Sequence, residues 1–312
     1  MTQDTRLATT LCGISLQNPV LAASGTFGYG VELARLVDLN LLGGLIVKGL
    51  SREPMDGNPP PRLWEAQGGM VNSIGLQNIG VHAFVRDKLP ALRRLRSAVF
   101  ANVFGYSVED YVEVVRVLES AEGLAGYELN VSCPNTRHGG MYFSSDCGLL
   151  SELVRAVRAV AKRPLIVKLS PNVSRIEQLA RSAEESGADA ISLINTFVSL
   201  PIDARARRPR LGAGFGGLSG PAIKPIALRM VYEAAQAVNI PVVGLGGITT
   251  GEDAAEFLVA GASAVQVGTA NFWDPAAPLR IARELGRFLE EERVLRVADL
   301  VGSLRWRGRD DQ

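Results

Sequence analysis

Cysteine and histidine are scarce in this sequence. The chain has three cysteines, Cys12, Cys133 and Cys147, and no two of them form a Cys-x-x-Cys pair. An odd number of widely spaced cysteines argues against a disulfide framework. With only two histidines, the chain also lacks the ligands for a zinc site or for an iron–sulfur cluster of its own. We therefore expect no metal centre.

A dominant charge and a long apolar run are absent as well. The 33 basic and 32 acidic residues leave a net charge of +1, which gives no field to attract nucleic acid or an anionic membrane. One local basic run, at residues 205–210, is interpreted as solvated loop charge. The first residues have no apolar signal-peptide core, and no apolar run reaches the roughly 18 residues of a membrane span. We expect a cytoplasmic protein with no nucleic acid or membrane partner.

Short apolar runs alternate with amphipathic stretches along the chain. Such alternation predicts a parallel sheet that is buried on both faces. Eight units predict an α/β fold, a single (β/α)₈ TIM barrel over residues 1–312, with a doubly wound open sheet as the alternative. The predicted strands are residues 19–23, 44–47, 99–103, 127–131, 164–169, 190–194, 241–245 and 264–267. The helical patterns include residues 107–118, 150–160, 176–186, 223–237 and 250–260.

A polar residue or a glycine stands where each predicted strand ends. In a barrel these ends converge on the C-terminal rim, where barrel enzymes place their sites. Buried lysine and asparagine side chains need polar partners, so a ring of them predicts a ligand-lined mouth. Three long loops, residues 49–80, 132–148 and 197–220, would cover it. The strand ends are Ser24-Gly25, Lys48-Gly49, Asn102, Asn130, Lys168, Asn195-Thr196, Gly246-Gly247 and Gly268-Thr269.

Glycines after the seventh and eighth strands indicate a ligand class. Gly246-Gly247 and Gly268-Thr269 occupy the usual phosphate-binding positions of a barrel, and Gly220 can add a further amide. Because glycine lets backbone N–H groups approach an anion closely, we predict a phosphate site there.

Residues 130–135 read Asn-Val-Ser-Cys-Pro-Asn and follow the fourth strand directly. This position puts Cys133 at the predicted mouth, among side chains that can form hydrogen bonds. Cys133 is therefore a candidate acid, base or nucleophile, and an incidental loop thiol is the alternative.

Together these segments resemble the dihydroorotate dehydrogenase family. The matching blocks run in order across nearly the whole chain, which makes the match highly specific. They are Lys48-Gly49, Gly57-Asn58-Pro59, residues 72–78, residues 130–135, residues 168–172, Asn195-Thr196, residues 216–226, Gly246-Gly247 and Gly268-Thr269. The resemblance implies a barrel with bound FMN that oxidises dihydroorotate to orotate in pyrimidine biosynthesis.

The resemblance also implies a branch of the family. A cysteine in the 130–135 loop is similar to the soluble class 1 enzymes, whereas the membrane-bound, quinone-reducing class carries serine there. Lys48-Gly49 and residues 72–78 resemble the NAD-linked catalytic subunits, and the fumarate-using branch tends towards Lys-Ser and Gly-Leu-Pro-Asn. The NAD-linked type implies a homodimer core with a second subunit that carries FAD and a 2Fe–2S cluster, a heterotetramer. Residues 143–147 and 200–203 depart from the family pattern, both in loop regions.

Three rivals remain open at this stage. They are a fumarate-reducing homodimer, a dihydropyrimidine dehydrogenase-like flavoenzyme, and a phosphate-binding barrel without redox chemistry.

Site roles follow from the same resemblance. Cys133 would be the general base, Lys168 would stabilise charge on the reduced flavin, and His138 has no assigned role. The substrate-binding residues would be Lys48, Asn72, Ser73, Ile74, Gly75, Leu76, Asn130, Asn195 and Thr196. The FMN-binding residues would be Ser24, Lys48, Gly49, Asn102, Asn130, Lys168, Ile194, Gly220, Gly246, Gly247, Gly268 and Thr269.

Overall fold

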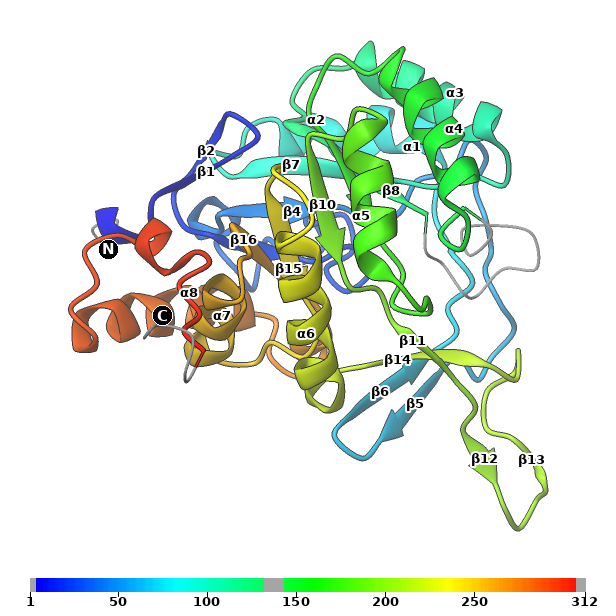
Figure 1. Ribbon diagram of the computed structural model, residues 1–312. Helices are drawn as coiled ribbons and strands as arrows, with labels where there is room; N and C mark the ends of the chain where they lie inside the picture. Colours follow the sequence, from blue (N-terminus) through cyan, green and yellow to red (C-terminus); the bar gives the residue numbers. More distant parts are fainter. Residues whose placement is uncertain (1–3, 132–142, 307–312) are drawn as a thin grey trace.

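The computed structural model describes residues 4–131 and 143–306 (Figure 1). Within these residues, eight parallel strands close into one barrel, and β16 pairs with β3 to complete the ring. This closure confirms the predicted (β/α)₈ barrel and excludes the open sheet. In barrel order the strands are β3 (Val20–Ala22), β4 (Gly44–Ile46), β7 (Ala98–Val103), β8 (Gly126–Asn130), β9 (Leu165–Lys168), β10 (Ala190–Leu193), β15 (Val242–Leu245) and β16 (Ala264–Val267).

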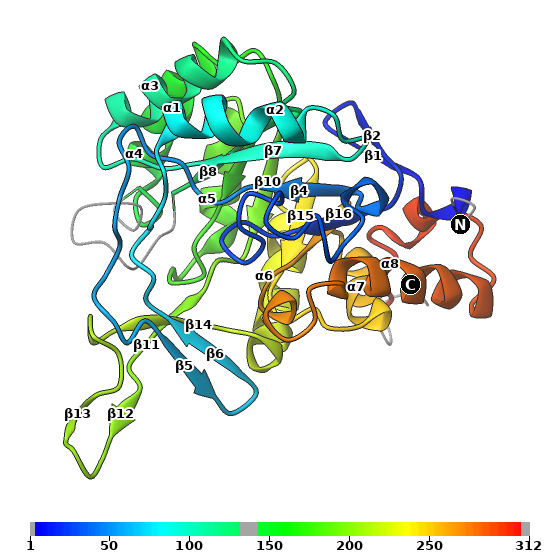
Figure 2. The same ribbon diagram turned by 180° about the vertical axis from the view of Figure 1, so that it is seen from behind.

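Helices surround the barrel, as the two opposite views show (Figures 1 and 2). The predicted helical segments correspond to α3 to α7, with small shifts at their ends that are usual for fraying termini. The longer helices are α3 (Val108–Glu119), α4 (Cys147–Arg158), α5 (Ile176–Glu185), α6 (Lys224–Ala235), α7 (Gly251–Val259) and α8 (Ala277–Glu291). The short ones are η1 (Thr5–Leu7), η2 (Leu39–Leu41), α1 (Val81–Ala83), η3 (Phe84–Lys88), α2 (Leu89–Leu92), η4 (Pro221–Ile223), η5 (Thr269–Phe272) and η6 (Val297–Leu300).

The N-terminal end of the barrel is plugged by a hairpin of β1 (Thr9–Leu11) and β2 (Ile14–Leu16). Its buried leucines pack with inward-facing apolar residues from seven of the eight barrel strands, all except β8. We call this cluster the lower layer. It consists of Leu11, Leu16, Leu21, Ile46, Phe100, Ile166, Ala190, Val243 and Ala264. Apolar side chains therefore close this end of the barrel, and the opposite end is left for a site.

Two of the long loops predicted to cover the mouth contain strands. In the described residues β5 (Leu63–Ala66), β6 (Gly69–Asn72), β14 (Gly216–Ser219) and β11 (Phe197–Ser199) form a four-stranded antiparallel sheet in the order β11-β14-β6-β5. We call it the loop sheet. A hairpin of β12 (Ile202–Asp203) and β13 (Arg208–Pro209) extends from it, away from the barrel (Figure 1).

In the basic run on this hairpin, residues 205–209 are exposed, as the interpretation as solvated charge predicted, and Arg210 is half-buried. One member also makes a specific contact, because the Arg210 guanidinium stacks over the Trp64 ring at 4.1 Å. Among the described residues, no helix is long and apolar enough to span a membrane.

Candidate active site at the mouth of the barrel

A large cavity lies at the C-terminal ends of the barrel strands. It has an empty volume of about 1250 Å³, part of it open to solvent. Residues at the ends of all eight barrel strands line it, together with side chains from the loop sheet. The structure therefore brings the polar strand ends together as the barrel prediction required.

Nearly every predicted site residue that the structure describes contributes to this wall, and Ser73 is the exception. Ser73 is 1% exposed, and its hydroxyl accepts a hydrogen bond from Asn58 Nδ2 at 2.9 Å, so it packs behind the wall. Cys133 and His138 lie outside the described residues. The predicted residues in the wall are Ser24, Lys48, Gly49, Asn72, Ile74, Gly75, Leu76, Asn102, Asn130, Lys168, Ile194, Asn195, Thr196, Gly220, Gly246, Gly247, Gly268 and Thr269.

The wall also includes residues that the sequence analysis did not select. Leu63 and Met70 come from the β5–β6 hairpin, Ser219 comes from β14, and Phe272 comes from η5. No sequence signal identifies the first two, because their place at the mouth depends on the pairing of β6 with β14.

Amide side chains converge on one side of the cavity. Asn195 Nδ2 donates to Asn130 Oδ1 at 3.3 Å, and Asn72 Nδ2 donates to the Gly217 carbonyl at 3.3 Å. Asn195 Oδ1 in turn accepts from the Thr196 N–H at 2.8 Å. Because each amide offers donors and an acceptor, this cluster can bind a planar polar ring.

Glycines shape the opposite side. Gly246 and Gly247 have φ angles of +129° and +84°, which side chains rarely adopt. A Cβ atom at either position would lie 2.8 Å from the Cβ atom of Ala227 or Lys224. Only glycine fits both positions, and the bare backbone there can approach an anion closely.

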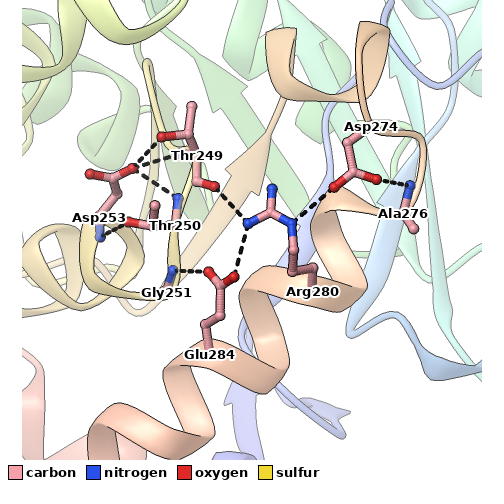
Figure 3. A network of polar contacts seen from close by, with 8 residues as sticks. All are labelled: Thr249, Thr250, Gly251, Asp253, Asp274, Ala276, Arg280 and Glu284. Atoms are coloured by element: carbon pink, nitrogen blue, oxygen red, sulfur yellow. Dashed lines mark hydrogen bonds and ion pairs between the residues drawn. The ribbon is translucent and has the colours of Figure 1, made fainter.

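A polar network on α8 joins the two loops that carry these glycines (Figure 3). We call residues 246–250, after β15, and residues 268–276, after β16, the glycine loops. Arg280 Nη1 donates to the Thr249 carbonyl at 3.1 Å in the first loop, and Nε donates to Asp274 Oδ2 at 2.9 Å in the second. Glu284 accepts from Arg280 at 3.0 Å and from the Gly251 N–H at 2.8 Å. Arg280 therefore fixes the distance between the loops.

Asp253 holds the first glycine loop from its other side. Its Oδ2 accepts from the Thr249 N–H and hydroxyl and from the Thr250 N–H, at 2.7 to 2.9 Å. Lys224 Nζ lies 2.6 Å from Oδ1. Burial raises the pKa of this carboxyl, but the hydrogen bonds from Lys224, Thr249 and Thr250 outweigh it and keep the pKa below its usual value.

A buried carboxylate below the cavity was missed by the sequence analysis. Glu128 of β8 is fully buried and accepts hydrogen bonds from Asn102 at 2.7 Å, Ser192 at 2.9 Å and Gln266 at 2.6 Å. Lys168 Nζ lies 3.6 Å from Glu128 Oε1. We call these five residues the upper layer. The sequence did contain a signal for Glu128, because it is a charged residue within the otherwise mostly apolar strand β8.

The two described cysteines are not part of the cavity wall. Cys12 lies at the β1–β2 turn, where burial and the nearby Asp189 charge raise its thiol pKa to about 12. Cys147 begins α4 on the surface, and its thiol pKa is also raised, chiefly by burial. Neither thiol is suited to act as a base at neutral pH.

Comparisons with known proteins agree with this geometry. The family model described as dihydroorotate dehydrogenase matches residues 6–289. A protein of Solibacter usitatus named putative dihydroorotate dehydrogenase A (fumarate) is 75% identical over 301 residues, which cover 96% of this chain and 99% of that protein.

Relatives with a different name are also similar. Proteins named dihydroorotate dehydrogenase B (NAD(+)), catalytic subunit, are 50% identical in Citrifermentans bemidjiense and 51% identical in Thermodesulfovibrio yellowstonii. The first match covers 96% of this chain and 98% of its relative, and the second covers 94% and 96%. The chain therefore belongs to the dihydroorotate dehydrogenase family.

Proposed function

We propose that this protein oxidises dihydroorotate to orotate in pyrimidine biosynthesis, with FMN bound in the mouth of the barrel and residues 1–312 acting as one FMN-binding domain. The observation that carries the proposal is the single cavity that combines an amide cluster, two strand-end lysines and a glycine cradle. A phosphate-binding barrel without redox chemistry would not need the amide cluster.

The residues of the cavity fit FMN. The cradle formed by Gly246 and Gly247 lines the cavity with backbone that carries no side chain, which suits the phosphate group. The other backbone contributions would come from Gly49, Ile194, Gly220, Gly268 and Thr269, and the side-chain contributions from Ser24, Asn102 and Asn130. When bound, FMN supplies the hydride acceptor. Lys168 would place positive charge beside the isoalloxazine ring, where reduction adds negative charge.

The amide cluster would bind the substrate. Asn72, Asn130 and Asn195 can donate to ring carbonyls and to the carboxylate and can accept from ring N–H groups. Thr196 and the segment Ser73–Leu76 would add backbone groups, and Lys48 would sit between the flavin and the substrate. Because Ser73 is buried behind the wall, its contribution would come from the backbone.

Cys133 would remove the proton from carbon 5 of dihydroorotate. It follows Asn130, which lines the cavity at the end of β8. A free thiol has a pKa of about 8.5, so only a small fraction is thiolate at neutral pH. Turnover should therefore rise between about pH 7 and pH 9.

We propose NAD⁺ as the final electron acceptor, reached through a partner subunit that carries FAD and a 2Fe–2S cluster. Two observations support this assignment. The motifs at Lys48-Gly49 and residues 72–78 resemble the NAD-linked type, and relatives at 50–51% identity are named NAD(+) catalytic subunits.

Fumarate is the second candidate acceptor. It is favoured by the Solibacter usitatus protein, which is 75% identical over nearly its full length and is named for fumarate. In that case the chain would function without an electron-transfer subunit.

A homodimer is proposed for either type. Large apolar side chains are exposed on the loop sheet and along the segments that lead to the hairpin beyond it, which supports an interface between two copies. They are Trp64, Val198, Leu200, Ile202 and Phe215. Sedimentation of the purified chain should give the mass of two copies, and a monomer would contradict the dimer.

Two experiments test the proposal. The purified chain should show a flavin spectrum that bleaches when dihydroorotate is added without oxygen, and a colourless protein that takes up no FMN would overturn it. NAD⁺ or fumarate is then added to the reduced protein, with and without subunits copurified from a coexpressed gene neighbourhood. Reoxidation by NAD⁺ only with an iron–sulfur subunit supports the NAD-linked type. Reoxidation by fumarate without one supports the second candidate.

A further inference from the structure

The proposed reaction assigns no role to the buried carboxylate of Glu128. It is fully buried within the barrel, at the level just below the cavity. An ionised carboxylate is costly to bury, and it is tolerated only where donors and a counter-charge surround it. Replacing a buried ion pair by apolar residues often leaves the free energy of unfolding unchanged or raises it. Stability alone therefore does not explain why Glu128 is charged.

Donors from separate strands all point at this carboxylate. Asn102 of β7 donates to Oε1, whereas Ser192 of β10 and Gln266 of β16 donate to Oε2. Gln266 turns its amide nitrogen to Glu128 even though its Oε1 then has no hydrogen-bond partner among the described residues. Both oxygens of the carboxylate therefore act as hydrogen-bond acceptors toward these three side chains.

Lys168 connects the carboxylate to the cavity. Its Nζ atom lies 3.6 Å from Glu128 Oε1 and 3.3 Å from Ser24 Oγ, and both Lys168 and Ser24 line the cavity. In the part of the chain that the structure describes, Glu128 is the only carboxylate within ion-pair distance of Lys168. The lysine side chain is 6% exposed, so water screens the pair little.

We propose that Glu128 is a positioning residue that holds Lys168 Nζ at the floor of the cavity and sets the reduction potential of the flavin above it. This inference rests on the proposed FMN site. The positive charge of Lys168 would stabilise a reduced flavin bound in the cavity, and the negative charge of Glu128 would oppose that effect. The ion pair therefore keeps the reduction potential of the flavin lower than an unpaired lysine would. Glu128 also holds Lys168 Nζ at one position in the cavity floor.

The test is the flavin midpoint potential of the Glu128→Gln holoprotein. This variant keeps the shape of the side chain and removes its charge. We expect the equilibrium ratio of reduced to oxidised flavin at a fixed potential to rise at least tenfold, which corresponds to about 30 mV for a two-electron couple. Ser192→Ala is the matched control, because it removes one donor to the same carboxylate without changing any charge. Its ratio should stay within about twofold of the wild type.

A second variant covers the case in which Glu128→Gln leaves Lys168 unpaired and does not fold. Glu128→Asp keeps the buried negative charge, but its shorter side chain draws the carboxylate away from Lys168 Nζ. We expect the ratio of reduced to oxidised flavin to rise, but by less than in Glu128→Gln, because the opposing charge then lies farther away. A wild-type potential in the Glu128 variants, or equal shifts in Glu128→Gln and Ser192→Ala, would show that the upper layer only fills space.

The wild-type spectrum separates this inference from the proposed function. If the wild-type protein binds no FMN, the proposed function fails. If it binds FMN and is reduced by dihydroorotate, but the potentials of the variants coincide, only the role of Glu128 fails.

Discussion

The lower and upper layers of the barrel interior differ sharply, although four strands, β7, β9, β10 and β16, contribute a residue to each. Phe100 lies in the lower layer and Asn102 in the upper, and β9 carries Ile166 and Lys168 in the same relation. Because side chains alternate between the faces of a strand, residues two positions apart face the interior at successive heights. A two-residue step therefore separates an apolar layer that stabilises the fold from a polar layer that touches the cavity.

The proposed base Cys133 gives the largest expected effect, and the closed end of the barrel offers a control cysteine. Cys133→Ser should lower turnover by about 10²–10⁴-fold while the flavin stays bound, because a positioned general base contributes on that scale. Cys12→Ser is the control at the closed end, where the raised thiol pKa of about 12 excludes a role at neutral pH. Steady-state kinetics of both variants measure this, and unchanged turnover in Cys133→Ser would remove it from the mechanism.

Phe100→Ala tests the structural half of the comparison. The ring is fully buried in the lower layer, so its removal should lower the free energy of unfolding by about 3–5 kcal/mol. Ser192→Ala in the upper layer should cost less, about 1.5–3 kcal/mol, because it removes one hydrogen bond to a buried carboxylate. Urea denaturation gives both values. If Phe100→Ala also shifts the flavin potential as Glu128→Gln is expected to, the two layers are not functionally distinct.

Arg280→Met tests whether the glycine loops depend on their joint attachment to α8. The change removes the donors to Thr249 and Asp274 and keeps most of the side-chain volume. We expect the dissociation constant for FMN to rise about tenfold, which corresponds to about 1.4 kcal/mol of binding free energy. The effect is limited because the arginine is partly exposed, so water can replace part of its hydrogen bonding to the two loops. Fluorescence titration of the apoprotein measures it.

Arg296→Met provides the control for that variant. Arg296 forms a similar ion pair with Asp299 in η6, outside the cavity wall. Equal FMN affinity in the two variants would show that the network does not act on the phosphate site.

The smallest expected effect is the loss of stability at low pH. Asp253 has a pKa lowered below its ordinary value of 3.8, so its contribution to stability is complete above that value. The contribution is lost as the pH falls through the lower pKa of the folded protein. The wild type should therefore lose stability and FMN affinity below about pH 4 more steeply than Asp253→Asn. Thermal unfolding at a series of pH values checks this, and parallel curves would contradict it.

Local sequence determined much of this protein. The alternation of apolar strands and helices predicted the barrel, because each element is defined by the period of its own side chains. The polar strand ends and the glycine pairs predicted the wall of the cavity, because parallel strands in a barrel all end at one rim. Lys48, Asn102 and Gly247 reach that wall as expected. The role of Cys133 stays a prediction.

Tertiary structure decided the rest. Residues 49–80 and 197–220 build one sheet, since β6 pairs with β14 across a separation that no local period encodes. Glu128 could be read as a charge in an apolar strand, but its partners on four other strands appear only when the barrel closes. The alternation along each strand determines which residues face inward. The distances between strands and loops depend on closure of the barrel, and these distances bring the separate polar residues together in one site.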